Sequence, residues 1–103
     1  MRPARLTGPE RESALADLAT AGWTHEVERD AVTKTYRFKD FSAAFGWMTR
    51  AALEAEKLDH HPEWRNTYNR VTVLLTTHDV KGLTVLDIEL ARAMDRLAAG
   101  QAQ

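Results

Sequence analysis

Cysteine is absent from the 103-residue chain. Disulfide bonds, thiol nucleophiles and cysteine-ligated zinc are therefore excluded. No apolar run is long enough to span a membrane, and the N-terminal stretch "MRPARLTGPERE" lacks the apolar core of a secretory signal. We therefore expect a cytoplasmic protein without a membrane partner.

An excess of charge of one sign is also missing. The formal net charge is −1 and the sequence pI is about 6.4, which argues against nucleic acid held mainly by its phosphates. No repeat, low-complexity tract or linker rich in proline, glycine or serine divides the chain. The length suits one independently folding unit. We expect a single domain over residues 1–103, with a tail at 99–103 that frays.

The first quarter of the chain predicts a short helix and a β-hairpin. Thr7 can cap the helix, with Glu10 at capping-box spacing, and Gly22 follows as its stop. The stretch "WTHEVERDAVTKTYRF" then alternates apolar and polar residues with a turn near positions 29–30, which is typical of two paired strands. His25 in this hairpin is interpreted as a core or interface histidine that is satisfied by its neighbours.

The segment "DFSAAFGWMTRAALEAEKL" changes to a helical period. Asp40 or Ser42 is the expected cap, and Pro62 is expected to end the helix. Apolar residues recur every three or four positions and predict a stripe that faces the core. The members of this predicted stripe are Phe41, Phe45, Met48, Ala52 and Ala55.

The last third predicts a strand, a loop and a final helix. "YNRVTVLLTT" is rich in β-branched residues, "HDVKGL" is a loop, and Thr84 with Asp87 has capping-box spacing at the start of a helix. The order is α, β, β, α, β, with room for a further short strand, then α. Strands joined by tight turns favour an antiparallel sheet, and we predict a two-layer α+β domain with helices on one face.

Three of the four histidines are the main candidates for function. His60 and His61 are adjacent at the predicted helix break, and His78 follows the next strand. If their rings converge, the flanking carboxylates are those of Glu56, Asp59, Asp79 and Asp87. Three interpretations stay open: polar residues at a helix end, a zinc or iron site, and metal-free acid–base chemistry.

The stretches "EKLDHHPEWRNTYNRV" and "LTTHDVKGLTVLDIELA" resemble the pterin-4a-carbinolamine dehydratases. The family pattern is an acidic residue, three residues, His-His-Pro, one residue and an aromatic, then Thr-His and a later Asp. The matching positions are Glu56, His60, His61, Pro62, Trp64, Thr77, His78 and Asp87. The resemblance extends over nearly all of the chain from Gly22 onward.

This resemblance implies a four-stranded antiparallel sheet in an α-β-β-α-β-β-α order and assembly as a homodimer or homotetramer. It implies a dehydratase, a hydro-lyase that converts 4a-hydroxytetrahydropterin to quinonoid dihydropterin and water. That reaction supports the recycling of tetrahydropterin for aromatic amino acid hydroxylation. No metal or cofactor is implied. The implied substrate-binding positions are Asp59, His60, His61, Thr76, Thr77, His78 and Asp79.

Roles can be divided among these residues as a hypothesis. His61 and His78 form the main proton-transfer pair, and His60 binds and stabilises the transition state. Glu56 and Asp87 orient imidazoles or the lip of the pocket, and Pro62 and Trp64 support the site. The alternative function is a non-catalytic dimerisation or partner-binding module, since some animal relatives stabilise the dimer of a transcription factor.

Overall fold

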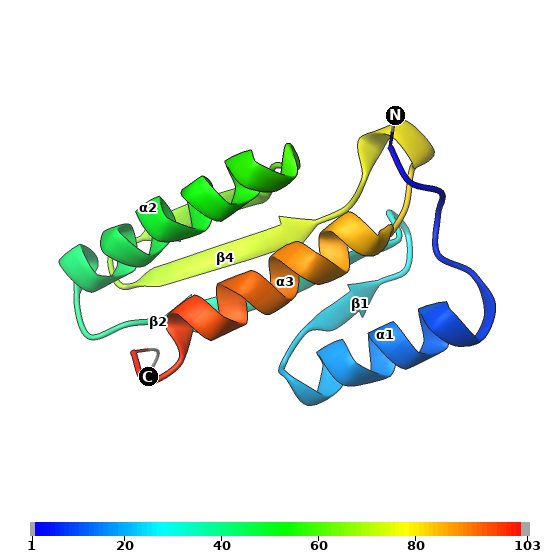
Figure 1. Cartoon of the computed structure of the whole chain (residues 1–103). Coiled ribbons are helices and arrows are strands. Elements are labelled where there is room, and N and C mark those ends of the chain that lie inside the picture. The colour runs from blue at the N-terminus through cyan, green and yellow to red at the C-terminus, as the bar shows by residue number, and fades with distance from the viewer. Residues whose placement is uncertain (1, 102–103) are drawn as a thin grey trace.

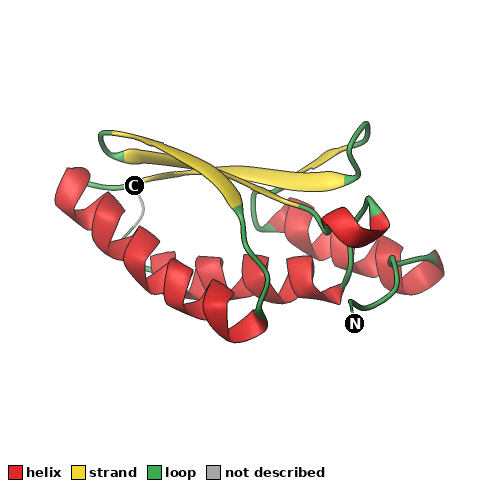
Figure 2. Ribbon diagram, turned by 90° about the horizontal axis from the view of Figure 1, so that it is seen from above, coloured by secondary structure: helices red, strands yellow, loops and turns green. Residues whose placement is uncertain are grey.

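A computed structural model describes residues 2–101 of the chain. In chain order its elements are α1 (Gly8–Thr20), β1 (Thr24–Glu26), β2 (Ala31–Arg37), α2 (Phe41–Leu58), β3 (Glu63–Thr67), β4 (Arg70–Leu75), the short 3₁₀ helix η1 (His78–Val80) and α3 (Val85–Ala98). Figure 1 shows their arrangement, and Figure 2 shows the helices on one side of the sheet. The predicted two-layer α+β fold is therefore confirmed.

The four strands form one antiparallel sheet in the order β1-β2-β4-β3. In β4 the inward-facing residues Val71, Val73 and Leu75 are fully buried, while the residues between them are not. This alternation is what a sheet covered on one face requires. The predicted hairpin is confirmed as β1 and β2, although Val27 lies beyond β1 and is exposed.

The fourth strand, β3, is an edge strand that the apolar pattern did not locate. Its five residues alternate between exposed and half-buried positions, so no apolar period marks it. A tight turn with Tyr68 at φ 49° joins it to β4. The segment predicted as a loop after β4 contains η1.

Helix α1 begins without the predicted side-chain cap. Thr7 is the N-cap residue, but its side chain makes no capping hydrogen bond, so the predicted capping box with Glu10 is wrong. Pro9 in the first turn suits a helix start, because its missing N–H would have no helical partner there. The helix ends at Thr20, and Gly22 follows with φ 97°, as the expected stop.

The predicted core stripe of α2 is wrong at its N-terminal end. Phe41 and Phe45 are 50% and 55% exposed. The face turned to the sheet is instead built from Ala44, Trp47, Ala51 and Ala55. Both faces of this helix carry apolar residues, so the period alone did not fix which one is buried.

The ends of α2 are set by two aspartates. Asp40 caps the start, since its carboxylate accepts a hydrogen bond from Ala43 N at 2.8 Å. The end lies at Leu58, where Asp59 adopts a left-handed conformation with φ 48°. Pro62 therefore follows the helix end but does not cause it. Asp59 turns the chain so that the two histidines leave the helix axis.

Helix α3 begins with the predicted capping box. The Thr84 side chain accepts from the backbone, and the Asp87 carboxylate accepts from Thr84 N at 2.9 Å. The helix ends at Ala98, and residues 102–103 of the predicted tail lie outside the described residues. No helix within residues 2–101 is long and apolar enough to cross a membrane.

Candidate active site

His60 is buried in a polar cluster between the end of α2 and the start of α3. Its Nε2 lies 2.6 Å from Asp87 Oδ1. The other oxygen of Asp87 accepts hydrogen bonds from Thr77 Oγ1 at 2.8 Å and from Thr84 N at 2.9 Å. His60 is 5% exposed and Asp87 is fully buried. The capping aspartate of α3 therefore also contacts an imidazole.

His61 lies on the surface beside its predecessor and has its own carboxylate. Its Nε2 is 2.6 Å from Glu56 Oε2 in the last turn of α2. Both side chains are more than half exposed. Glu56 thus contacts an imidazole, which agrees with its predicted orienting role, and the His61 ring is open to a ligand.

His78 is the first residue of η1, and its ring is also exposed. Its Nε2 lies 3.3 Å from Glu63 Oε2. Glu63 is held in turn by Arg29, whose two terminal nitrogens lie 3.0 and 2.7 Å from the two carboxylate oxygens. This guanidinium lowers the pKa of Glu63. Neither Glu63 nor Arg29 is among the residues predicted from the sequence; the one signal for Glu63 is that it adjoins Pro62.

A basic residue near the N-terminus bridges the two predicted substrate-binding segments. The residue is Arg2: its Nη2 lies 3.8 Å from Asp59 Oδ2, and its Nε lies 3.7 Å from Asp79 Oδ2. Figure 1 shows the N-terminal end of the chain beside the η1 turn. The two carboxylates are mostly exposed, so the ion pairs are weak individually. They nevertheless place the segment after α2 next to the segment after β4.

Thr76 and Thr77 directly precede His78 in the chain and are buried. Thr77 is paired through its backbone with Gly82, with N–O distances of 2.9 and 3.3 Å. Residues 77–82 therefore form a loop closed at its base, and we call it the His78 loop. The threonine hydroxyls face the protein interior: that of Thr76 donates to Asp30 O at 3.1 Å, and that of Thr77 lies 2.8 Å from Thr84 Oγ1.

Pro62 and Trp64 are half-buried next to the histidines. The Trp64 ring packs against Trp47, with centroids 6.3 Å apart. Trp64 and Glu63 also line a groove of about 380 Å³ on the open face of the sheet. Trp64 therefore links the candidate site to the core.

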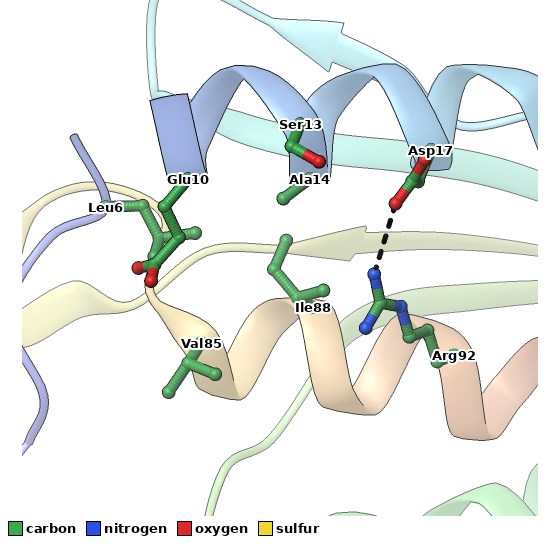
Figure 3. A pocket seen from close by; sticks show the side chains of 8 residues that line it. All are labelled: Leu6, Glu10, Ser13, Ala14, Asp17, Val85, Ile88 and Arg92. Atoms are coloured by element: carbon green, nitrogen blue, oxygen red, sulfur yellow. Dashed lines mark ion pairs between the residues drawn. The ribbon is translucent and has the colours of Figure 1, made fainter. Parts of the chain in front are cut away.

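A second groove, of about 300 Å³, lies between α1 and α3 (Figure 3). An ion pair between Asp17 and Arg92 spans it at 3.5 Å. Its lining residues include none of the predicted site residues. The candidate site is instead made of the segments after α2 and after β4, which carry the three histidines.

The three candidate histidines thus each contact a different carboxylate. Among residues 2–101, no group of three or more His, Asp and Glu side chains could hold a metal ion. An imidazole paired with a carboxylate is suited to proton transfer near neutral pH, because the carboxylate fixes the ring and stabilises its charged form. The rings of His61 and His78 are exposed, whereas that of His60 is buried against Asp87.

The fold and these pairs define a class of protein: a two-layer α+β domain with histidine–carboxylate pairs where α2, β4 and α3 meet. The family model for pterin 4 alpha carbinolamine dehydratase matches residues 4–97. The chain belongs to this family, which makes it a hydro-lyase. The resemblance seen in the sequence is therefore confirmed.

Similar proteins agree with this assignment. Two relatives share the name "Putative pterin-4-alpha-carbinolamine dehydratase". The one from Bradyrhizobium sp. (strain ORS 278) is 59% identical over 92% of this chain and 93% of its own. The one from Jannaschia sp. (strain CCS1) is 55% identical over 91% of this chain and 96% of its own.

Solved structures share the fold. The "transcriptional coactivator/pterin dehydratase" of Brucella melitensis has a TM-score of 0.83 and 55% identity over 91% of this chain and 98% of its own. A pterin dehydratase-like protein described as a RuBisCO assembly factor of the alpha-carboxysome has a TM-score of 0.66 over 78% of this chain and 92% of its own. Its identity is 17%, so it is similar in fold alone.

Proposed function

We propose that this protein dehydrates 4a-hydroxytetrahydropterin to quinonoid dihydropterin by histidine acid–base catalysis. The observation that carries the proposal is that three histidines, each beside its own carboxylate, lie on the two segments that the family pattern marks. The names of its relatives at 55–59% identity support the substrate class. We propose a role in recycling tetrahydropterin after aromatic amino acid hydroxylation; a cytoplasmic location stays a prediction.

The reaction requires two proton transfers and no change in oxidation state. A proton is delivered to the 4a-hydroxyl, the C4a–O bond breaks as water leaves, and the proton on N5 is removed as the C4a–N5 double bond forms. His61 and His78 perform these transfers, because their rings are exposed and can reach a bound heterocycle. We expect no requirement for a metal or cofactor.

His60 has a different role, because its ring is buried against Asp87. A fixed, carboxylate-paired imidazole at the floor of a site can stabilise charge that develops in the transition state. The proposed substrate contacts come from Asp59, His60 and His61 on one segment and from His78 and Asp79 on the other. Thr76 and Thr77, whose hydroxyls bond inside the protein, support the second segment. Arg2 stabilises the arrangement of the two segments through Asp59 and Asp79.

The direct test is a stopped-flow measurement. The 4a-hydroxytetrahydropterin is generated in the cell, and its dehydration is followed by ultraviolet absorbance after treatment of the protein with a chelator. Wild type should accelerate the reaction, and the variant His61→Ala/His78→Ala should not. The matched control Glu12→Ala/Glu89→Ala changes two exposed side chains on α1 and α3 and should behave as wild type. No acceleration by folded wild type would refute the dehydratase proposal.

We also propose that the chain forms a homodimer or homotetramer through the outer face of α2. Phe41, Phe45 and Leu53 are at least half exposed on this helix, and the two phenylalanine rings are 5.8 Å apart. Such exposed apolar groups mark protein interfaces. Phe41→Ser/Phe45→Ser should reduce the mass measured by light scattering, and an unchanged mass would place the interface elsewhere.

The same α2 face keeps a second candidate function open, that of a partner-binding module. The Brucella melitensis neighbour is named both a coactivator and a dehydratase. Replacing His60, His61 and His78 together by alanine separates the two functions. A partner-binding module should keep its biological effect in this variant, whereas a dehydratase should lose it.

A further inference from the structure

Asp30 is a buried carboxylate outside the predicted site. It lies in the turn between β1 and β2, with φ 50° and only 4% exposure. Its oxygens are surrounded by cationic or nitrogen-bearing side chains: Arg11 at 2.6 and 3.0 Å, His25 at 2.8 Å and Arg5 at 3.2 Å. Arg11 is the main cause of a strongly lowered Asp30 pKa, so this carboxylate is a permanent anion near neutral pH.

The same residue contacts the His78 loop on both sides of its base. The backbone carbonyl of Asp30 accepts a hydrogen bond from Thr76 Oγ1 at 3.1 Å. Its carboxylate oxygen Oδ2 accepts one from Leu83 N, also at 3.1 Å. Thr76 directly precedes the loop and Leu83 directly follows it. Both bonds are buried, where losing a partner costs most.

A glycine allows this close approach. A Cβ added to Gly82, the last residue of the loop, would lie 2.5 Å from Asp30 Oδ2 and 2.4 Å from Arg5 Nε. Real Cβ atoms do not tolerate such distances, so a larger residue here would displace the carboxylate or the guanidinium. The loop base and the Asp30 cluster are thus packed directly against each other.

From these contacts we propose that Asp30 is a positioning residue for the dehydration reaction: it holds both sides of the His78 loop base, so that His78 is presented to the pterin. The inference rests on the proposed function. Asp30 does not touch the substrate, because its oxygens are buried and occupied by protein donors. It acts through His78, the loop residue whose exposed ring transfers a proton.

A double-mutant cycle separates this role from a general effect on folding. Asp30→Gly removes the carboxylate, and glycine adopts the left-handed conformation without strain. In otherwise wild-type protein it should lower kcat about tenfold and change KM less than about threefold, because misplacing a catalytic group affects the chemical step. In a His78→Ala background it should lower kcat less than about twofold, since the positioned group is already gone.

Two further variants complete the comparison. Asp30→Asn keeps an acceptor for Leu83 N and tolerates positive φ; it should restore kcat to within about threefold of wild type. Asp17→Asn is a matched control, because this exposed aspartate pairs with Arg92 away from the loop, and it should leave kcat unchanged. All rates are taken at temperatures where circular dichroism shows folded protein.

Two outcomes would overturn the proposal. One is an unchanged kcat in folded Asp30→Gly. The other is an equal loss in both backgrounds, which would indicate a merely structural role. If Asp30→Gly does not fold, Gly82→Ala enters the same cycle under the same criteria, because it disturbs the same contact from the loop side.

Hydrogen exchange keeps this inference distinct from the proposed function. The amides of Gly82 and Leu83 are followed in wild type and in Asp30→Asn and Asp30→Gly. Exchange at both positions should accelerate at least about tenfold in Asp30→Gly, because the loop base opens more often. If wild type does not catalyse dehydration but this acceleration occurs, the proposed function is wrong, while the inference that Asp30 holds the base of the His78 loop is supported. If the exchange of both amides is unchanged in Asp30→Gly, Asp30 does not hold the loop base, whatever the catalytic activity.

Discussion

Two buried aspartates hold the base of the His78 loop from different elements, Asp30 from the β1–β2 turn and Asp87 from the first turn of α3. Asp87 contacts one imidazole, one hydroxyl and one backbone N–H, which belong to His60, Thr77 and Thr84. Asp30 contacts two guanidinium groups, one imidazole and one backbone N–H, which belong to Arg5, Arg11, His25 and Leu83.

The difference lies in what balances each negative charge. Two arginines accompany Asp30, and their charge does not change near neutral pH, so this carboxylate serves as a fixed anchor. Asp87 has no arginine partner among the described residues, and its carboxylate contacts the His60 imidazole, a hydroxyl and a backbone N–H instead. The two aspartates thus support the His78 loop in different ways: Asp30 is paired with arginines, and Asp87 is paired with an imidazole.

The largest effect is expected from the removal of the Asp87 carboxylate. Asp87→Ala should lower the free energy of unfolding by about 4 kcal/mol, because several buried partners are left unpaired. Urea unfolding measures this loss. Asp87→Asn keeps the shape and an acceptor and should lose clearly less. A loss below about 1 kcal/mol in the alanine variant would show that this cluster contributes little to stability.

The next effect separates the buried histidine from an exposed one. His60→Ala should cost about 3 kcal/mol, since it empties a buried site and leaves Asp87 short of a partner. His61→Ala should cost less than about 0.5 kcal/mol, because that ring is on the surface. Thermal and urea unfolding of the two variants test this, with activity measured in parallel. Equal destabilisation by His60→Ala and His61→Ala would contradict the assignment of His60 as a buried structural imidazole and of His61 as an exposed one.

A third effect concerns Asp30 and the loss of stability in acid. The pKa of Asp30 is held below its ordinary value of 3.8. Its contribution to stability is therefore complete above that value and is lost as the pH falls toward the folded-state pKa. Wild type should lose about 2 kcal/mol more than Asp30→Asn between pH 5 and pH 2, by the order of magnitude for such a shift. Urea unfolding across this range measures it, with Ser13→Ala as a surface control; parallel curves would contradict the assignment.

The smallest expected effect concerns the exposed pair beside His78. Arg29→Ala should leave the stability measured by urea unfolding almost unchanged, because the ion pair is solvent-exposed. It should raise the pKa of Glu63, since Arg29 is the main cause of its lowering. Carbon-detected NMR titration of the Glu63 carboxyl reports this directly, with Lys57→Ala as a remote control. An unchanged titration would show that the pair does not persist in solution.

Local chemistry predicted much of the fold. Asp40 and the Thr84–Asp87 box start their helices as expected, because capping depends on residues within one turn. The hairpin was predicted from period-two alternation and β4 from its β-branched residues. Two predictions failed because the local pattern was not decisive. β3 has no fully buried face that would produce an apolar period, and α2 has apolar residues on both sides.

The family motif also marked every histidine of the candidate site and two of the carboxylates beside them. It could not mark Arg2, Arg29, Asp30 or Glu63 as partners, because their contacts join residues far apart in the chain. The Asp30–Leu83 hydrogen bond, for example, spans 53 positions. No local sequence pattern near Asp30 or Leu83 predicts this hydrogen bond.

Short-range spacing in the chain was enough to predict the helix starts, the pairing of the hairpin strands and the family. Which apolar face of α2 is buried, which histidine is enclosed and which aspartate is paired with arginine depend on contacts between distant parts of the chain. Burial and charge pairing depend on what the rest of the chain brings to a position. That is why His60 and His61, adjacent in sequence, differ so widely in exposure.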